Sequence, residues 1–311
     1  MHSRIVGTGS YLPSRILTND ELARSVDTSD EWIRSMTGIG QRHIAGDQES
    51  TTDMAAIAAN RALAAAGMRA DAIDLIIVAT ISPDLVFPTT AAMVQSRIGA
   101  RTVGCFDLSA ACSGFLFGLA MADGMIASGK CRSALVIGAE RMSKLLDWSE
   151  RSTCVLFGDG AGAAVLVSSE TPGIRTTSLH ADGSTPDVLR TPAKDSPYLH
   201  MDGGAVFKFA VRSMVDGGSE ALRANGMTPD EVTWLIPHQA NLRIIEASAK
   251  KLRIGAERVV VSVDRHANTS AASIPLALDE AVRDGRIKRG DTVLLLSVGG
   301  GFTWASCMLD W

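Results

Sequence analysis

Short apolar runs alternate along this chain with segments that have the spacing of buried or amphipathic helices. Residues 103–108, 134–137 and 163–167 are predicted strands, because each is a compact apolar run of strand length. Similar runs lie at residues 74–78 and 234–236. Strands that alternate with helices predict mostly parallel sheets covered by helices on both faces, so the pattern indicates an α/β protein.

Two of the helices can be placed from their ends. Thr51 or Thr52 is the expected cap of an alanine-rich helix that stops before Gly67. Ser29 is the expected cap of a second helix over residues 30–37, which a glycine terminates.

The chain contains an internal repeat. When Ser109 is placed over Ser270, an offset of 161, eight of the 21 positions from Ser109 to Gly129 are identical. Both segments follow an apolar run and precede another, and residues 259–263 are the predicted strand before the second copy. A repeat of this length is a whole α/β unit rather than a solenoid element.

The repeat divides the chain into two parts. We expect two similar α/β halves, residues 1–170 and 171–311, packed about a pseudo-twofold axis. The region 168–202 is rich in Pro, Gly, Thr and Asp, and we expect it to connect the halves as surface loops.

Composition narrows the class of protein. The net charge of -4 over 311 residues argues against general nucleic-acid binding, which needs a basic surface. No run approaches 18 apolar residues, so no membrane span is expected, and the first twenty residues lack the apolar core of a signal peptide. The five cysteines are odd in number and form no C-x-x-C motif, which predicts neither a disulfide framework nor a zinc site. A cytoplasmic enzyme without a metal is the expected class.

Cys112 is the candidate nucleophile. It follows a predicted strand and lies among small residues, where a helix is expected to begin. Unpaired amides at a helix N-terminus favour a thiolate, which is the reactive form of cysteine. A buried structural cysteine is the alternative interpretation, since cysteine is among the most buried residue types.

Three further segments place polar groups at the ends of predicted strands. His238 follows Pro237, which ends the pairing of its strand because proline has no N–H to donate. Asn268 precedes the second small-residue helix, and residues 299–301 are three glycines whose amides can face a ligand oxygen. Each feature alone is common in structural roles. Together, a nucleophile, neutral donors and backbone amides meet the needs of acyl-thioester chemistry.

Two other classes remain open from the residues alone. The segment around Cys112 is similar to a nucleophile elbow, and Cys112, Asp159 and His238 follow the hydrolase order of nucleophile, acid and base. Against a hydrolase stand the repeat and the segment around Asn268. A nucleotide-binding module based on Gly7-x-Gly9 or on the glycines of residues 158–162 lacks the three-glycine spacing that opens a helix.

The chain also resembles a known family, the β-ketoacyl-acyl carrier protein synthases III. These are the initiating condensing enzymes of type II fatty acid synthesis, and they have the thiolase fold. The matching motifs run in the family's order through the whole chain: Gly7-Thr8-Gly9-Ser10-Tyr11-Leu12-Pro13, Thr28-Ser29-Asp30-Glu31-Trp32-Ile33, Ala110-Ala111-Cys112-Ser113-Gly114, Phe157-Gly158-Asp159-Gly160-Ala161-Gly162, Pro237-His238-Gln239-Ala240-Asn241, Asn268-Thr269-Ser270-Ala271-Ala272-Ser273 and Gly299-Gly300-Gly301-Phe302.

The resemblance implies a thiolase-like fold of two halves with mixed sheets between helices, and a catalytic triad of Cys112, His238 and Asn268. The implied reaction begins when Cys112 takes an acyl group from acyl-CoA, through an oxyanion held by the backbone amides of Cys112 and Gly300. Malonyl-acyl carrier protein then loses CO₂, and His238 and Asn268 stabilise the enolate. The carbanion attacks the acyl-cysteine and releases 3-oxoacyl-acyl carrier protein. No metal or redox cofactor is implied, and CoA thioester is a substrate.

The resemblance also implies binding residues. Trp32 and Arg151 match a pair that holds the CoA adenine, and Thr28 and Asn241 match further contacts of the donor. Three departures from the family's pattern lie in this region, where Met36 and Gly40 replace common basic residues and Gly204 replaces an asparagine. They leave open a carrier-bound donor, or a synthase III relative that makes a specialised metabolite.

Two macromolecular partners are implied as well. A docking patch for the acidic carrier protein is expected at Arg243, Lys208, Lys250 and Lys251, whose alternative interpretation is a solvated helix face. Phe87 matches a residue that reaches across a homodimer into the partner's acyl pocket. A homodimer is therefore expected. Neither nucleic acid nor a membrane is an expected partner.

Overall fold

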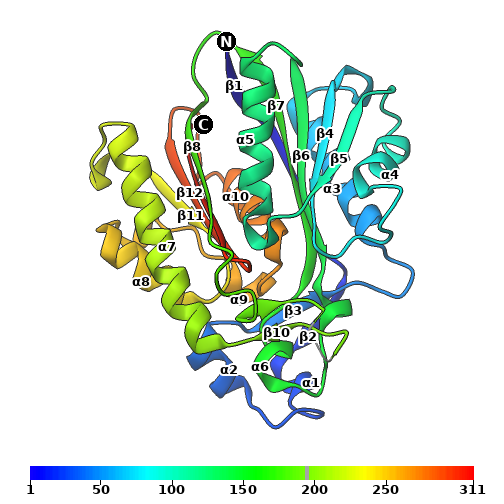
Figure 1. Cartoon of the computed structure of the whole chain (residues 1–311), viewed down its shortest axis with the longest axis vertical. Helices are drawn as coiled ribbons and strands as arrows, with labels where there is room; N and C mark the ends of the chain where they lie inside the picture. The colour runs from blue at the N-terminus through cyan, green and yellow to red at the C-terminus, as the bar shows by residue number, and fades with distance from the viewer. Residues whose placement is uncertain (193–195) are drawn as a thin grey trace.

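The computed structural model describes residues 1–192 and 196–311, which form two sheets with helices between and around them (Figure 1). The predicted connection over residues 168–202 therefore includes three residues, 193–195, that lie outside the described residues. Two small ribbons accompany the sheets. Their strands are β2 (Arg15–Thr18) with β3 (Gln41–Ile44), and β9 (Leu189–Arg190) with β10 (His200–Met201).

The first sheet has the order β1-β7-β6-β4-β5. Its strands are β1 (His2–Tyr11), β4 (Leu75–Ala79), β5 (Gly104–Leu108), β6 (Ser133–Arg141) and β7 (Asp159–Ser169). β4 is parallel to β5 and β6, whereas β7 is antiparallel to β6 and β1. The predicted apolar runs in this half are all strands. The sheet is mixed because β1 and β7 run against the parallel core.

The second sheet repeats this arrangement in the order β8-β13-β12-β11. Its strands are β8 (Ile174–Ala181), β11 (Trp234–Pro237), β12 (Thr292–Gly299) and β13 (Thr303–Asp310). The predicted strand at residues 259–263 is wrong. Val259 makes a single parallel bridge to Leu235, at the place where β5 lies in the first sheet, and a short helix already begins at Val263.

The strand register corrects the offset of the repeat. In the first sheet Leu75 pairs with Ala134, and in the second Trp234 pairs with Val293, each 159 residues further along the chain. The offset of 161 is therefore displaced by two residues in the strands. The matches that favoured it are mostly alanine and glycine, which specify little packing. The division at residue 170 stays a prediction, although β7 ends at Ser169 and β8 begins at Ile174.

The helices form three layers (Figure 1). α3 (Thr51–Ala66) and α4 (Thr90–Arg97) cover the outer face of the first sheet, and α7 (Gly203–Ala224) and α8 (Leu242–Leu252) that of the second. Between the sheets lie α5 (Gly114–Ala127) and α10 (Ser273–Arg283). Four short helices complete the chain: α1 (Asn19–Leu22), α2 (Asp30–Thr37), α6 (Arg151–Cys154) and α9 (Val263–His266). This is the thiolase-like architecture that the resemblance implied.

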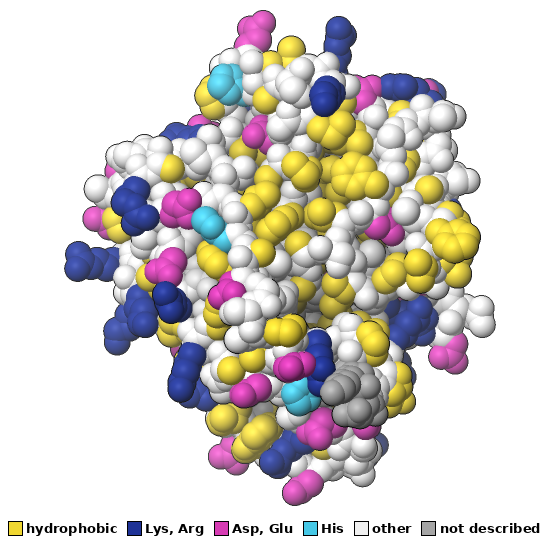
Figure 2. Space-filling view, in the orientation of Figure 1, with side chains coloured by type: hydrophobic (Ala, Val, Ile, Leu, Met, Phe, Trp, Pro, Cys, Tyr) yellow, Lys and Arg dark blue, Asp and Glu magenta, His cyan; other side chains and the backbone are white. Residues whose placement is uncertain are grey.

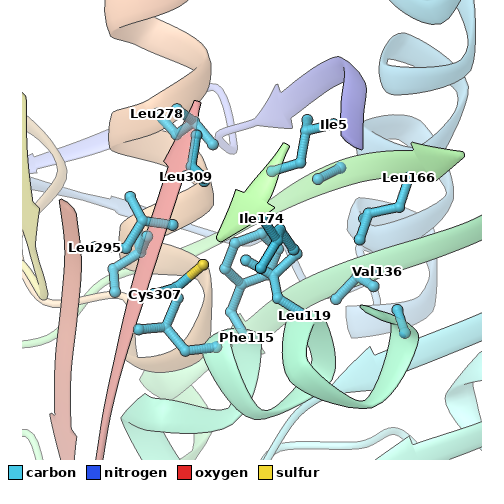
Figure 3. Packing of buried hydrophobic residues seen from close by; sticks show 14 of the residues in the cluster. Ile5, Phe115, Leu119, Val136, Leu166, Ile174, Leu278, Leu295, Cys307 and Leu309 are labelled. Atoms are coloured by element: carbon cyan, nitrogen blue, oxygen red, sulfur yellow. The ribbon is translucent and has the colours of Figure 1, made fainter. Parts of the chain in front are cut away.

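The central layer contains a large apolar core, shown in Figure 3. Phe115 and Leu119 of α5 pack there against Val136 of the first sheet and Leu295 and Cys307 of the second. Burying large side chains of this kind stabilises the fold by about 1.5–3 kcal/mol each. Both sheets therefore hold the N-terminal ends of α5 and α10 in fixed positions, and Cys112 and Asn268 lie just before those ends.

Local sequence explains most helix ends. Ser29 caps α2 and Gly38 ends it in a left-handed conformation, as predicted. The cap of α3 is Ser50 rather than Thr51 or Thr52, because Ser50 and Asp53 form a capping box that begins one residue earlier than expected. The connection between the halves is more regular than predicted, since β8 occupies residues 174–181.

Glycines pack the helices closely against the sheets. A Cβ on Gly9 would lie 2.2 Å from the amide nitrogen of Ala62 in α3, and one on Gly162 would lie 2.7 Å from Pro275 in α10. Both glycine motifs that a nucleotide-binding module would use are thus needed for close backbone approach. The structure assigns them to packing.

Candidate functional site

Cys112 lies where two cavities meet. The residue belongs to a 3-10 turn over Ala111–Ser113, and α5 begins only at Gly114, slightly later than the sequence predicted. Ala111 has a positive φ of 47°, which turns the chain sharply between β5 and the helix. A cavity of about 540 Å³ and another of about 400 Å³ both reach Cys112.

The larger cavity brings the expected triad together. His238 and Asn268 line it with Cys112, although the three residues come from distant parts of the chain. All three are buried, with exposed fractions of 9% for Cys112, 2% for His238 and 7% for Asn268. The arrangement places one sulfur and two polar side chains around the same enclosed space.

His238 is held as a neutral donor. It follows β11, and its backbone N–H donates to Leu296 at 2.7 Å. Its Nδ1 is 2.6 Å from the hydroxyl of Ser273, which also accepts the amide of Gln239 at 3.3 Å. That hydroxyl already accepts a hydrogen bond from the Gln239 amide, so its own proton is donated to Nδ1 of His238. The ring proton of His238 is then on Nε2, which is free to donate. Burial lowers the pKa of His238 to about 3, so the ring is uncharged at neutral pH.

Asn268 is oriented by three hydrogen bonds. Its backbone bonds to the strand-like segment at Leu156 and Gly158, at 2.9 and 3.0 Å. The side-chain oxygen accepts the amide of Ser270 at 2.9 Å. Since Oδ1 is occupied, the Nδ2 group is the part of this side chain with donors left for the cavity.

The thiol of Cys112 is surrounded by protein and not by water. Burial, the largest influence, and the charge of Glu140 raise the pKa of Cys112, whereas the hydroxyl of Ser270 and the cysteine's own amide lower it; the pKa is raised to about 12. The start of α5 two residues later favours negative charge on the sulfur and so acts against burial.

The glycines at the end of β12 lie against the nucleophile. A Cβ on Gly299 would be 2.7 Å from the amide nitrogen of Cys112, so only glycine allows this approach. Gly300 lines the smaller cavity with Cys112. The two residues whose amides are predicted to hold an oxyanion, Cys112 and Gly300, therefore line the same cavity.

Trp32 and Arg151 lie together at the larger cavity. The guanidinium carbon of Arg151 is 4.8 Å from the centroid of the Trp32 ring, and both residues are exposed. Arg151 also donates to the carbonyl of Asp27 at 3.0 Å. Thr28 follows Asp27 directly, and its hydroxyl is buried without a partner among the described residues, but it does not line the cavity.

Asn241 lines the larger cavity while capping α8. Its side chain accepts the amide of Arg243 at 2.8 Å and donates to the carbonyl of Met36 at 3.1 Å. Two of the departures from the family's pattern, Met36 and Gly204, line the larger cavity. The third, Gly40, leaves room for the guanidinium of Arg34, which a Cβ there would approach to 2.6 Å.

The basic residues divide into two groups. Lys208 of α7 and Arg243 of α8 line the larger cavity, whereas Lys250 and Lys251 lie at the far end of α8. All four are exposed, and Figure 2 shows Lys and Arg side chains gathered along the left edge over α7 and α8. Phe87 lines neither cavity. It is 83% exposed, in the loop after β4.

Sequence reasoning missed three residues of the site. Ser273 bonds the ring of His238, and the hydroxyl of Ser270, two residues after Asn268, donates to the buried carboxylate of Glu140. The only available signal for Glu140 was a single acidic residue at the end of an otherwise apolar strand. Among the residues that the structure describes, no group of three His, Cys, Asp or Glu side chains could hold a metal ion. Within the same part of the chain, no helix is long and apolar enough to span a membrane.

The fold and site define a class, a thiolase-fold acyltransferase with a cysteine in its active-site cavity. Comparison with known proteins agrees. Two family models match, the 3-oxoacyl-[acyl-carrier-protein] synthase III model over residues 106–183 and its C-terminal counterpart over residues 222–311. The β-ketoacyl-[acyl-carrier-protein] synthase III of Xanthomonas campestris is 54% identical, and the match covers 99% of this chain and 98% of the relative.

Solved structures extend the comparison. The 3-oxoacyl-[acyl-carrier-protein] synthase III of Aquifex aeolicus has a TM-score of 0.97 and 49% identity, covering 99% of this chain and all of that one. A priming β-ketosynthase of a polyketide pathway has a TM-score of 0.95 and 38% identity, covering 99% of this chain and 96% of that one. This chain belongs to the β-ketoacyl-acyl carrier protein synthase III family of condensing enzymes.

Proposed function

We propose that this protein condenses an acyl-CoA, most simply acetyl-CoA, with malonyl-acyl carrier protein and so starts type II fatty acid synthesis. The observation that carries the proposal is the junction of two cavities at Cys112, one of them lined by His238 and Asn268. An acyl group on the sulfur can occupy one cavity while a second thioester enters through the other.

The first half-reaction loads the enzyme. The sulfur of Cys112 attacks the thioester carbonyl, and the tetrahedral oxyanion is stabilised by the amides of Cys112 and Gly300. Preorganised donors of this kind lower such barriers by about 3–4 kcal/mol for each donor. The C–S bond to CoA breaks, CoA leaves as a thiol with the proton that Cys112 has lost, and the acyl group stays on the cysteine sulfur as a thioester. Apolar side chains of the smaller cavity, among them Ile81 and Leu189, surround the acyl chain.

The second half-reaction forms the carbon–carbon bond. Malonyl thioester places its carbonyl oxygen at the Nε2–H of His238 and the Nδ2–H of Asn268. Loss of CO₂ leaves an enolate, whose charge these two neutral donors stabilise. The carbanion attacks the acyl carbon, and Cys112 is released with 3-oxoacyl-acyl carrier protein. Decarboxylation supplies the carbanion, so we propose no cofactor beyond the CoA thioester substrate.

Donor binding is proposed at the mouth of the larger cavity. An adenine ring can stack on Trp32 and lie beside the Arg151 guanidinium, as cation–π and stacking contacts allow. Thr28 follows the Asp27 carbonyl that Arg151 bonds, and we propose that it supports this pair rather than contacting the donor directly, because it does not line the cavity. Asn241 contributes less than the resemblance implied, because its amide already bonds Arg243 and Met36.

The carrier protein is proposed to dock over α7 and α8. Lys208 and Arg243 are exposed at the cavity itself, and Lys250 and Lys251 extend the positive surface along α8. An acidic carrier is attracted to such a surface although the whole chain carries a net charge of -4.

We propose that the protein is a homodimer. β5 is an edge strand with half-buried residues, and Leu85, Val86 and Phe87 are exposed in the neighbouring loop. Figure 2 shows hydrophobic side chains spread over the middle and right of this face, over α5 and the strands beside it. A patch of this kind marks an interface. Phe87→Asp is expected to weaken the dimer, which sedimentation measures.

A cytoplasmic location is also proposed. All five cysteines are free in the structure, as is usual in a reducing compartment. Acyl-CoA, the proposed donor, is an intracellular metabolite.

Two alternatives make different predictions. A thioester hydrolase needs an acid behind its histidine, but Asp159 bonds Ala45 and Ser143 whereas His238 bonds Ser273. A synthase III relative of specialised metabolism is favoured by a polyketide ketosynthase and a tetronic acid condensing enzyme among the similar structures, and by Met36, Gly40 and Gly204.

One assay separates the three. The protein is incubated with acetyl-CoA and malonyl-acyl carrier protein, and the products are identified by mass spectrometry. The proposal predicts acetoacetyl-acyl carrier protein. Free acetate without condensation supports the hydrolase, and condensation only with a different acyl donor supports the specialised enzyme.

A further inference from the structure

A buried carboxylate is hydrogen bonded to the turn that follows Asn268. Glu140 is near the end of β6, and its exposed fraction is 0%. Buried acids are rare, because loss of water is costly for the charged form, and each one needs hydrogen-bond partners. The reaction described above makes no use of this residue.

One oxygen of Glu140 is fixed by the loop after β4. Oε2 accepts three hydrogen bonds from this loop, from the Thr80 hydroxyl at 3.1 Å, the Ile81 amide at 3.1 Å and the Ser82 hydroxyl. The Ser82 hydroxyl also accepts the backbone amide of Arg141, at 2.8 Å. The carboxylate is therefore anchored on the first sheet through this oxygen alone.

The other oxygen of Glu140 reaches the second half of the chain. Oε1 accepts the hydroxyl of Ser270 at 2.9 Å, across 130 residues of sequence. The backbone amide of Ser270 donates in turn to Oδ1 of Asn268, also at 2.9 Å. Two successive hydrogen bonds therefore connect the end of β6 with a side chain that lines the larger cavity.

Ser270 has a backbone conformation that needs support. Its φ is 49°, in the left-handed region, and the residue is fully buried. A residue with a Cβ is strained in this region, so it stays there only where surrounding contacts compensate. The hydrogen bond from its hydroxyl to Glu140 is a contact of this kind. If φ relaxed, the amide of Ser270 would turn away from Asn268.

The same conformation occurs at the matching place in the first half. Ala111, which begins the turn that contains Cys112, has a φ of 47° and lies 159 residues before Ser270, the offset of the strand register. A side chain also ties that turn to a strand, since the Thr303 hydroxyl donates to the carbonyl of Ala110 at 2.8 Å. Strain that is kept at both turns of the site indicates that each turn must hold one direction.

We propose that Glu140 is a positioning residue for Asn268, the donor assigned above to the enolate. Its carboxylate holds Ser270 in the conformation that directs the Ser270 amide at Oδ1 of Asn268. This role deepens the proposed function and rests on it, since that function gives Asn268 its part in decarboxylation. Glu140 lines neither cavity and acts through Ser270.

An asparagine needs such orientation because its side chain has two unlike ends. The amide can turn over and exchange its oxygen with its NH₂ group, at little cost in shape. With the oxygen toward the cavity, Asn268 would repel the negative charge of an enolate instead of donating to it. The Ser270 amide is a donor and therefore selects the orientation in which Oδ1 faces the turn and Nδ2 faces the substrate.

The test measures release of CO₂ from malonyl-acyl carrier protein alone, with the full chain. The Cys112 thiol forms no bond in this reaction, so changes in its acidity do not enter the rate. Ser270→Ala is expected to lower kcat about 10-fold, because a misplaced donor loses part of the stabilisation that it supplies in the right place. The KM should not change, because the carrier protein is bound over α7 and α8.

A glycine at position 270 separates the conformation from the hydroxyl. Ser270→Gly also lacks the hydroxyl, but glycine adopts a positive φ without strain. Its kcat should therefore lie between those of the wild type and Ser270→Ala. A hydroxyl that served any purpose other than holding φ would be missed equally in both variants.

Two variants of Glu140 test the other end of the connection. Glu140→Gln can keep it, since the amide oxygen accepts from the loop after β4 and the NH₂ group donates to the Ser270 hydroxyl. Glu140→Met has a similar size without these polar atoms, so its kcat should fall as in Ser270→Ala while that of Glu140→Gln stays closer to the wild type. The double variant Glu140→Met with Ser270→Ala should be no slower than the slower single one, because both act through one connection.

Thr8→Val is the matched control. Thr8 is buried, and its hydroxyl donates to the buried acid Asp279 at 2.8 Å, so the substitution removes a contact of the same kind. Thr8 lines neither cavity. Its substitution should leave kcat and KM unchanged.

Three results overturn the positioning role. The first is a wild-type kcat in Ser270→Ala, and the second is an equal loss in Thr8→Val, which would show general damage to the fold. The third is a kcat of Ser270→Gly no higher than that of Ser270→Ala. If Glu140→Met does not fold, the two variants of Ser270 still give the answer.

A wild-type protein that releases no CO₂ contradicts the proposed function instead. Crystal structures then test the positioning role without activity. An Asn268 side chain that is displaced in Ser270→Ala but not in Ser270→Gly supports it. An Asn268 side chain in the wild-type position in both variants overturns it.

Discussion

The guanidinium of Arg151 lies over the indole ring of Trp32, 4.8 Å from its centroid. Trp32 belongs to α2 and Arg151 to α6, and the loop hydrogen bond from Arg151 to Asp27 fixes their approach. Because both residues line the larger cavity, a planar ligand can enter beside them without disturbing the core.

Removing the indole of Trp32 should weaken binding of the acyl-CoA donor and change little else. Trp32→Ala is expected to raise the KM for acetyl-CoA about 10-fold, since stacking contributes on the order of 1–2 kcal/mol, and to leave kcat nearly unchanged. Steady-state kinetics check this. The KM of Trp32→Phe for acetyl-CoA should lie between those of the wild type and Trp32→Ala. A truncated donor without the nucleotide should show no change of KM, and an equal loss with that donor would contradict adenine stacking.

The triad should divide its work between the half-reactions. Cys112→Ser is expected to abolish acyl transfer, because an alkoxide forms far less readily than a thiolate. His238→Ala and Asn268→Ala should slow decarboxylation of malonyl thioester by about 100-fold or more each, as for a lost oxyanion donor. Both should still acetylate Cys112. Quench-flow measurement of each half-reaction separates the roles, and a variant that decarboxylates normally but cannot be acetylated would reverse them.

Burial of His238 should make the protein sensitive to acid. Its pKa is lowered to about 3 in the folded state, so below its ordinary pKa the unfolded chain binds a proton that the folded protein does not. The stability conferred by the neutral ring is complete above about pH 6.5 and is lost as the pH falls toward 3, by at most about 1.4 kcal/mol per pH unit. His238→Gln should reduce this loss in urea titrations between pH 7 and pH 4. His2→Gln, at an exposed position, should not.

The basic surface over α7 and α8 should contribute to binding of the carrier protein. Lys208→Glu together with Lys250→Glu is expected to raise the KM for malonyl-acyl carrier protein about 10-fold, and added salt should reduce the difference. Lys130→Glu is the control with the same charge change per residue. It follows α5, whose 14 residues begin beside Cys112, so it lies about 20 Å from the site. An equal rise of the KM for malonyl-acyl carrier protein in Lys130→Glu would indicate a general effect of charge rather than docking over α7 and α8.

The sequence was informative where chemistry depends on residue type and position in the chain. Cys112, His238 and Asn268 could be identified from strand ends and motifs, and the structure brings all three to one cavity. The strand predicted at residues 259–263 failed, because that segment pairs only through Val259 and gives way to α9. The apolar β-branched residues of that segment indicate that it is buried, and they do not show that it pairs with a neighbouring strand.

The remaining features depend on tertiary contacts. Glu140 gave little signal, because its partners Thr80, Ser82 and Ser270 come from two other segments of the chain. The surroundings of Cys112 are another example. A helix end is visible in a sequence, but the loss of water around the sulfur is not, and this loss raises the pKa of the thiol.

Acylation of Cys112 is tested by the intact mass of the protein after incubation with acetyl-CoA alone, followed by peptide mapping. We expect one acetyl group for each chain, on the peptide that contains Cys112, and its loss when malonyl-acyl carrier protein is added. An unmodified Cys112 that still reacts with iodoacetamide would contradict acetyl-CoA as the donor. An acetyl group on a different residue would contradict Cys112 as the nucleophile.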